Sequence, residues 1–569
     1  MIPLSLADNK VAAGVFALLL IASFAVAFAV PLWDIDLWWH LATGRYIAEH
    51  KSLLQADPFC YTSSLGIAPG RSGLLNAYWL AQLVFYAVHS IAGAYGLITL
   101  RVVLLTGILL SIYIKGVKEG ASYPVILIIL VLAGWIFTRF TGERPQLFSF
   151  LLAPLAFWML EGIYDPRRTP QVTGRSLAPL MIMMLVWANL HGGFILGSVL
   201  AVMYGLSEMV RSMISRELDR KRVRMICLAV VLPVAATLLN PNTYRLYWDI
   251  ISYEGSILQQ RTSEYLSPLT LTYQDPYSLA PYWLYTALFL TALFVSLKKI
   301  DMVHLVVSLF LAFLSLYSYR YIPFFVGVTA PLAARYISGI VEARGRLKKA
   351  VYAGAAALVC AAVIISAAGA RETLGKTLKH QLRPSRFPES AASFLLGNAA
   401  AGNMLNHFNW GGYLSWRFYP ARRVFIDGRV LNMKVYADYT VMLWDEARAG
   451  RLLDYYGVQI VVLPGLNPFT GELYRIIDLM VRDPQWHLVY SDETALIFVR
   501  GESNRDLISR FAAPKKEAYS HVISQGTNML KSGQRSPGVL SALETAYRET
   551  GRERGKGGAY PDTGSLPVQ

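Results

Sequence analysis

Long apolar segments constrain this chain more than any other feature, because each is long enough, or nearly so, to cross a lipid bilayer. A membrane-spanning helix needs about 20 mainly apolar residues, and fewer where it ends at a break. Such segments occur at residues 11–31, 95–114, 122–140, 146–164, 177–190, 193–210, 224–240, 282–298, 302–318, 321–337 and 350–369. Only 16% of the residues are charged, whereas soluble proteins have about 25%. The sequence therefore predicts a polytopic α-helical membrane bundle of about eleven spans.

The basic residues predict the orientation of this bundle. With the N-terminus inside, five loops fall on the inner side and hold 17 Lys and Arg against 6 Asp and Glu. These inner loops are 115–121, 165–176, 211–224, 298–301 and 338–349. The longer outer loops hold 8 Lys and Arg against 9 Asp and Glu. An excess of Lys and Arg marks cytoplasmic loops, so we expect the N-terminus inside and the C-terminus outside, in a bacterial-type inner membrane.

The domain organisation follows from a change of composition after Gly369. Residues 1–370 form the predicted bundle, with outer interfacial helices at about 34–92. These helices include the segment 75–92, which is mainly apolar but contains several polar residues. Strand-like runs at Arg423–Ile426, Gln459–Leu463 and Leu496–Arg500 predict an extracytoplasmic α/β domain over 371–502. We expect a helical extension over 503–550 and a disordered tail over 551–569.

The net charge of +16 does not indicate a nucleic-acid-binding protein. Its basic residues cluster in short loops between apolar segments, which is the pattern of membrane orientation. We therefore expect membrane lipid and no nucleic acid as a partner.

The first outer loop carries a pair of carboxylates, Asp34 and Asp36, flanked by tryptophans, with His40 four residues further on. Two such carboxylates can share a divalent cation, for example Mg²⁺ or Mn²⁺, or one can act as a general base. His40 would share a helix face with Asp36 and could bind a metal or phosphate or carry a proton. The alternatives are solvated loop acids and an interfacial histidine bonded to backbone.

Three arginines lie on the predicted outer side, although Lys and Arg are more frequent in the predicted inner loops. Arg139, Arg144 and Arg320 stand at predicted span ends, where guanidinium groups can bind the phosphate of a lipid carrier or extend to lipid headgroups. His191, followed by Gly192 and Gly193, interrupts an apolar hairpin. A polar break at membrane depth lines a cavity or is buried in protein, so phosphate binding and tight helix packing both remain open for His191.

The extracytoplasmic domain has its own polar and aromatic group. Asn409, Trp410 and Tyr413 precede Asp427 and Arg429. These residue types suit recognition of a sugar or acceptor by stacking and hydrogen bonds. The alternative is a glycine-rich turn that leads into a pair of strands.

At these residues the chain resembles the GT-C superfamily of integral membrane glycosyltransferases. The resemblance rests on Asp34 and Asp36 in the first outer loop, the segment 75–92 and the domain after Gly369. It implies transfer of a sugar from a polyprenyl-phosphate carrier, with Asp34 or Asp36 as base or metal ligand and the outer arginines holding the phosphate. The segment at Trp410 to Tyr413 is more weakly similar to the WWDYG motif of oligosaccharyltransferases, although a glycine stands where that motif has its aspartate.

The leading hypothesis is a glycosyltransferase that moves a sugar from a polyprenyl-phosphate-type carrier to an acceptor glycan, lipid or protein at the outer face of the membrane. The alternatives are a lipid or polysaccharide transporter or flippase, and a non-catalytic membrane assembly protein. A transporter would need polar groups along the spans, whereas the candidates here lie almost entirely on one side.

Overall fold

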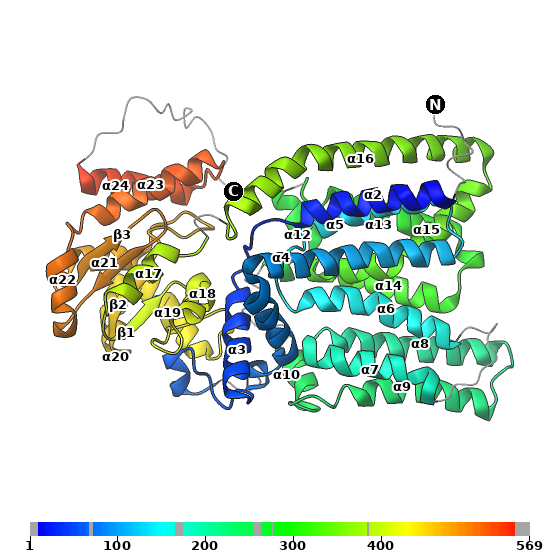
Figure 1. Ribbon diagram of the computed structural model, residues 1–569, viewed down its shortest axis with the longest axis horizontal. Coiled ribbons are helices and arrows are strands. Elements are labelled where there is room, and N and C mark those ends of the chain that lie inside the picture. Colours follow the sequence, from blue (N-terminus) through cyan, green and yellow to red (C-terminus); the bar gives the residue numbers. More distant parts are fainter. Residues whose placement is uncertain are drawn as a thin grey trace. The chain divides into compact units, whose positions relative to one another are not determined.

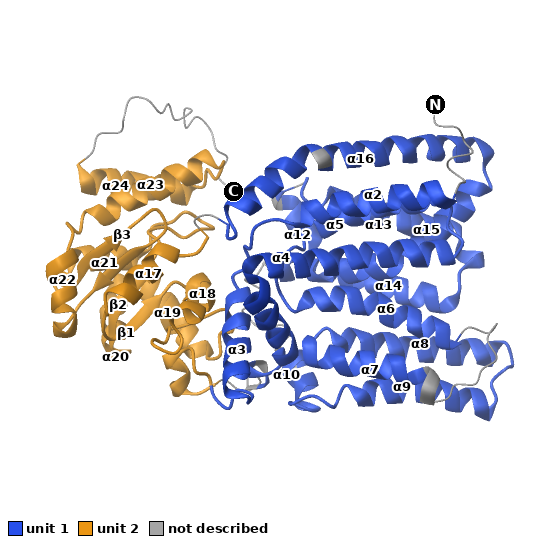
Figure 2. Ribbon diagram, in the orientation of Figure 1, with its two compact units in different colours: residues 1–56, 69–383 blue, residues 57–68, 384–569 orange. Residues whose placement is uncertain are grey.

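The computed structural model of the chain consists of two compact units (Figure 2). It describes residues 10–67, 72–164, 174–253, 263–275, 277–383 and 386–551. The first unit comprises residues 1–56 and 69–383, and the second comprises 57–68 and 384–569. The expected tail at 551–569 lies outside the described residues except for its first residue.

The first unit is a bundle of helices, most of which run side by side (Figure 1). Its helices are α2 (Lys10–Phe28), α3 (Leu37–His50), α4 (Trp79–Lys118), α5 (Tyr123–Phe137), α6 (Gln146–Tyr164), α7 (Gly174–Leu190), α8 (Phe194–Ile214), α9 (Arg220–Ala236), α10 (Arg245–Tyr253), α12 (Pro268–Gln274), α13 (Ala280–Val295), α14 (Met302–Tyr317), α15 (Ile322–Glu342) and α16 (Gly345–Lys379).

Apolar helices dominate this unit. Among the described residues, six helices are long and apolar enough to cross a membrane: Lys10–Phe28, Trp79–Lys118, Gln146–Tyr164, Phe194–Ile214, Tyr319–Glu342 and Gly345–Lys379. Four shorter apolar helices accompany them, at Tyr123–Phe137, Leu177–Leu190, Ala280–Val295 and Met302–Tyr317. The predicted bundle of apolar helices is confirmed.

The segment 75–92 joins the following span. It belongs mostly to α4, whose helix is broken at Gly93 with φ 57°. A positive φ suits glycine because a side chain would strain this conformation. The part of α4 before the break packs against α3, and Figure 1 shows α3 running across the end of the bundle rather than along it. In this arrangement the first part of α4 supports α3, which follows Asp34 and Asp36 in the chain.

Ion pairs fasten the end of the bundle opposite to α3. His304 Nε2 of α14 lies 2.7 Å from Glu161 Oε1 of α6, and Lys115 Nζ of α4 lies 2.7 Å from Glu161 Oε2. At a rise of about 1.5 Å per residue, Glu161 is about 22 Å along α6 from Gln146 at its other end. The bundle therefore has two polar ends separated by an apolar middle.

The second unit is built on a four-stranded sheet with the order β1-β2-β4-β3. Its strands are β1 (Asn403–Asn406), β2 (Val458–Leu463), β3 (His487–Ser491) and β4 (Leu496–Val499). β1 is parallel to β2, and β4 is antiparallel to both β2 and β3. The accompanying helices are α17 (Glu389–Gly397), α18 (Gly411–Phe418), α19 (Met433–Trp444), α20 (Glu446–Tyr455), α21 (Arg475–Arg482), α22 (Arg505–Phe511), α23 (Glu517–Lys531) and α24 (Pro537–Thr550). A small C-terminal sheet domain is thus confirmed.

Residues of the first outer loop fold with this second unit. Tyr61 N–H donates to Val424 O at 3.0 Å, and Val424 N–H donates to Phe59 O at 2.9 Å. The segment Arg423–Ile426, expected as a strand, therefore makes only an isolated bridge to Cys60. The helices α23 and α24, expected as a separate extension, share the sheet's core through Tyr519, Val522 and Ala542.

Candidate functional site

Four charged side chains of the first unit meet at one end of the helical bundle. Arg144 Nε lies 2.7 Å from Asp34 Oδ2, its Nη2 lies 3.2 Å from Asp36 Oδ2, and its Nη1 lies 3.1 Å from Glu264 Oε2. These residues come from three loops, after α2, after α5 and before α12. We call Asp34, Asp36, Arg144 and Glu264 the Arg144 cluster. The structure thus brings together three of the residues predicted for a site, Asp34, Asp36 and Arg144.

A buried arginine of α4 holds the loops beneath this cluster. Arg101 is 1% exposed and donates to the carboxylate of Glu143, to Thr141 O at 3.1 Å and to Val30 O. Glu143 Oε2 in turn accepts the backbone N–H of Asp34 at 3.2 Å. Arg101 and Glu143 therefore fix the two loops that carry Asp34 and Arg144.

The two aspartates differ in their access to solvent. The Asp34 side chain is 2% exposed, whereas that of Asp36 is 21% exposed. Asp36 accepts from Trp39 Nε1 at 3.2 Å, and its own N–H donates to Asp34 Oδ1 at 2.9 Å. Burial and the nearby carboxylates of Asp34 and Glu264 raise the pKa of Asp36 to about 6, against the lowering effect of Arg144. Asp36 is thus the more accessible of the two aspartates, with a pKa raised to about 6.

The third loop of the cluster lies against the turn before α15. Ser318 Oγ donates to Glu264 O at 3.1 Å, and Tyr319 N–H donates to Leu266 O at 2.9 Å. The guanidinium of Arg320 then lies over the ring of Tyr265 at 4.5 Å. A cation on an aromatic face is attracted by the ring quadrupole. This contact places Arg320 next to Tyr265, which follows Glu264 in the chain.

His191 is held in the turn between α7 and α8. Its Nδ1 accepts the backbone N–H of Gly193 at 3.0 Å and lies 2.7 Å from Ser149 Oγ. Its ring stacks on Tyr78 at 5.7 Å. Burial and the positive charge of Arg320 lower the pKa of His191 to about 3. The imidazole is therefore neutral at physiological pH.

His40 lies on α3 and also contacts Tyr78. Its ring is 5.5 Å from the Tyr78 ring, and its Nδ1 is 3.3 Å from Gln82 Nε2. It is 3% exposed. The structure thus places His40 and His191 on the same tyrosine.

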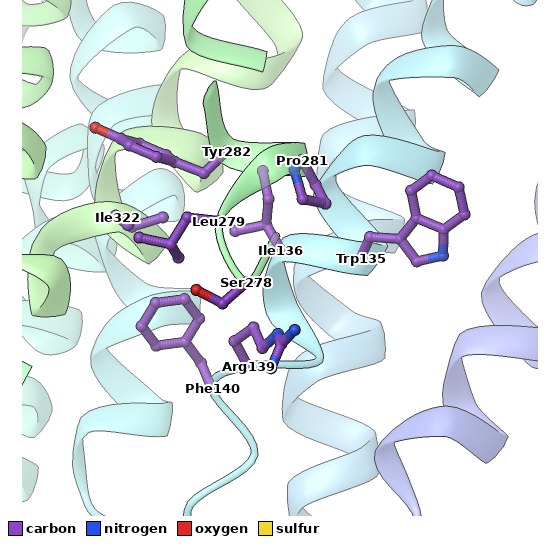
Figure 3. Close-up of a pocket in the computed structure, with 9 residues that line it drawn as sticks. All are labelled: Trp135, Ile136, Arg139, Phe140, Ser278, Leu279, Pro281, Tyr282 and Ile322. Atoms are coloured by element: carbon purple, nitrogen blue, oxygen red, sulfur yellow. The ribbon is translucent and has the colours of Figure 1, made fainter. Parts of the chain in front are cut away.

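Arg139 lines a small pocket at the end of α5 (Figure 3). The empty volume of this pocket is about 220 Å³, including space open to solvent. Its other lining residues are mostly apolar: Trp135, Ile136, Phe140, Ser278, Leu279, Pro281, Tyr282 and Ile322. Arg139 itself is exposed, and its carbonyl accepts from Tyr319 Oη at 3.4 Å.

The polar group predicted in the C-terminal domain is largely buried inside the second unit. Arg429 Nη2 lies 2.5 Å from Asp427 Oδ2 and 2.9 Å from Asp57 Oδ1, and all three side chains are at most 3% exposed. Trp410 is 5% exposed and Tyr413 is 2% exposed. Asn409, in the turn before α18, is half-buried. These residues therefore hold the segment 57–62 and α18 to the sheet unit.

A cation shared by Asp34 and Asp36 does not fit this arrangement. The guanidinium of Arg144 contacts both carboxylates and Glu264 as well, so it already stands where a shared Mg²⁺ or Mn²⁺ would have to bind. Within the described parts of the chain, no group of three or more His, Cys, Asp or Glu side chains is arranged to hold a metal ion.

The sequence-based prediction missed several residues that build the site. Arg101 could have been recognised from the sequence, because a charged residue inside an apolar span usually has a functional or structural role. Glu264 is one of several acids in a long loop, and no pattern distinguished it. Ser149 lies in an apolar run and has no sequence signature.

The chain was compared with known proteins by sequence and by structure. No protein family model matches it, and no curated protein matches it in sequence. Solved structures do match its fold.

One match is an oligosaccharyltransferase of Archaeoglobus fulgidus, solved in complex with zinc and sulfate. It superposes with a TM-score of 0.58 over 95% of this chain and 86% of the other, at 11% identity. Another is ArnT of Cupriavidus metallidurans bound to undecaprenyl phosphate, with a TM-score of 0.50 over 86% of this chain and 98% of the other, at 10% identity. The chain therefore shares the fold of these two solved structures, as its resemblance to the GT-C glycosyltransferases predicted.

Proposed function

We propose that this protein is a glycosyltransferase that moves a sugar from a polyprenyl-phosphate-type carrier to an acceptor at the outer face of the membrane. The observation that carries the proposal is the Arg144 cluster, in which two aspartates, a glutamate and an arginine from three loops meet at one end of an apolar helical bundle. The ArnT structure with the same fold holds undecaprenyl phosphate, which supports a lipid phosphate as the donor.

Asp36 is the proposed general base. It is the more accessible of the two aspartates, and a base with a pKa near the working pH combines the right protonation state with sufficient driving force. The acceptor's nucleophilic atom forms a bond to the anomeric carbon, the bond from that carbon to the carrier phosphate breaks, and Asp36 takes the acceptor's proton. This displacement inverts the anomeric centre.

Cationic and neutral donors stabilise the departing phosphate in this proposal. Arg320 and His191 act on each other electrostatically and supply a guanidinium and an imidazole N–H. Arg139 provides a third cation, beside the apolar pocket at the end of α5. Donors fixed in place before the reaction stabilise charge as it develops on the leaving group.

Asp34 and Glu264 act through Arg144. Both carboxylates bind its guanidinium, and Asp34 is almost fully buried. We infer that they hold Arg144 in position next to Asp36. There its positive charge balances the negative charge that develops on the departing phosphate. A step through a metal ion is not part of this scheme, because Arg144 already binds both aspartates.

The test is transfer of labelled sugar from a lipid carrier in membranes that contain the protein. The variant Asp34→Ala/Asp36→Ala should lose the transfer seen for the wild type. The matched control is Glu49→Gln, which removes an exposed carboxylate of α3 that pairs at the surface with Arg45. Equal transfer by the double variant and the wild type would refute the assignment of this site.

A further inference from the structure

A chain of three side chains leads from the core of the bundle to His191. Trp187 of α7 is fully buried, and its indole N–H donates to Ser149 Oγ of α6 at 2.6 Å. Ser149 is also fully buried, and its Oγ lies 2.7 Å from His191 Nδ1. The candidate site therefore rests on an ordered polar chain that enters from two apolar helices.

The directions of these hydrogen bonds determine the proton positions. Indole N–H can only donate, so Ser149 Oγ accepts from Trp187 and uses its own proton elsewhere. The backbone N–H of Gly193 donates to His191 Nδ1 at 3.0 Å, so this nitrogen carries no proton. Ser149 therefore donates to the same Nδ1, and the neutral ring keeps its proton on Nε2.

The turn leaves no room for a different arrangement. A Cβ on Gly193 would lie 2.5 Å from Ser149 Oγ and 2.9 Å from His191 Nδ1. Both distances are below any real Cβ contact, so a side chain here would separate the serine from the histidine. Glycine at 193 is thus required by the hydrogen-bonded chain itself.

The groups around His191 disfavour a second proton on the ring. Tyr78 stacks on one face, and Arg320 is the charged side chain that acts on it electrostatically. A positive neighbour and burial both oppose the imidazolium form. Two donors directed at Nδ1 oppose it as well, because a protonated Nδ1 could accept neither.

We propose that Ser149 and Trp187 are positioning residues, which hold His191 as a neutral donor whose Nε2–H binds the phosphate of the lipid carrier. This inference rests on the proposed function and deepens it. His191 then donates through the same neutral nitrogen over the whole pH range in which a free histidine titrates. Arg320 provides the positive charge that attracts the phosphate, and His191 provides a directed hydrogen bond to it.

The test measures the Kd for undecaprenyl phosphate, added to the purified full-length protein in detergent, at pH 8, where the carrier phosphate and Asp36 are both deprotonated. Ser149→Ala removes the donor that holds the His191 ring, so binding should weaken roughly two- to tenfold. Ser149→Thr, which keeps the hydroxyl, should restore the wild-type Kd.

Further variants separate this role from simple packing. Trp187→Phe keeps a ring and removes the N–H, and Gly193→Ala displaces the serine from the histidine, so both should reproduce the weaker binding if Ser149→Ala does not fold. Ser111→Ala is the control, because Ser111 is a buried serine bonded to its own helix at Ile108 O. A wild-type Kd in Ser149→Ala, Trp187→Phe and Gly193→Ala would overturn the inference. Failure of the wild type to bind undecaprenyl phosphate would instead contradict the proposed function.

Discussion

At the scale of single residues, the two aspartates of the first outer loop show how neighbours separate chemically similar groups. Asp34 is buried against Arg144 and Glu143, and Asp36 is partly exposed while it shares the same arginine. The proposal accordingly gives carboxylates two residues apart different roles, one positioning and one reactive. Spacing alone could not assign these roles, because exposure depends on loops that are distant in sequence.

The pH dependence of transfer tests the role of Asp36. The pKa of Asp36 is raised to about 6, mainly by burial, and a general base acts only in its deprotonated form. We predict that kcat/KM is constant above about pH 7 and falls about tenfold per pH unit below pH 6. Asp36→Asn should be inactive at every pH. A wild-type rate that stays constant down to pH 4.5 would contradict the assignment.

Removal of divalent metals tests the role of Arg144. Because its guanidinium binds both aspartates, we predict that EDTA leaves the transfer rate unchanged. The measurement is the initial rate of labelled-sugar transfer with and without chelator. Loss of activity that Mg²⁺ or Mn²⁺ restores would show that a cation displaces Arg144 from the carboxylates during the reaction.

At the scale of elements, the loop between α5 and α6 determines where Asp34 lies. A Cβ on Gly142 would be 2.4 Å from Asp34 Oδ2, so Gly142→Ala must displace the carboxylate while leaving every charged group present. A misplacement of about 1 Å can reduce catalysis by about a hundredfold. We predict a loss of transfer of roughly this size, measured as kcat/KM. Gly107→Ala in α4, whose Cβ would meet its nearest neighbour at 3.7 Å, should keep full activity.

The elements also show what the sequence could predict. The apolar helices followed from segment length, and β2 and β4 followed from runs of branched residues such as Val458–Leu463. The strand expected at Arg423–Ile426 was wrong, because the backbone N–H groups of Phe425 and Ile426 donate to the Asn406 side chain. The fold of residues 57–68 with the second unit could not be predicted, because it depends on the buried pair of Asp57 and Arg429, which are 372 residues apart.

At the scale of the whole molecule, the proposed function requires the Arg144 cluster to face away from the cytoplasm. The excess of Lys and Arg in the predicted inner loops supports this orientation. It is tested with single cysteines at Ser64 and Ser215, both exposed, in a background without Cys227 and Cys360. Cys60 is buried in the second unit and does not interfere. We predict that an impermeant thiol reagent labels position 64 in intact cells and labels position 215 only after lysis. Labelling of 215 in intact cells would reverse the orientation.

The central claim is that the carrier phosphate binds next to the Arg144 cluster, at the end of the bundle where Arg320 and His191 lie. A cryo-electron microscopy structure of the full-length protein with undecaprenyl phosphate tests this claim most directly. We predict phosphate density within hydrogen-bond reach, about 3 Å, of the Arg320 guanidinium or His191 Nε2, with the lipid chain against the apolar helices. Phosphate bound at the opposite end, beside Lys115 and His304, would contradict the account.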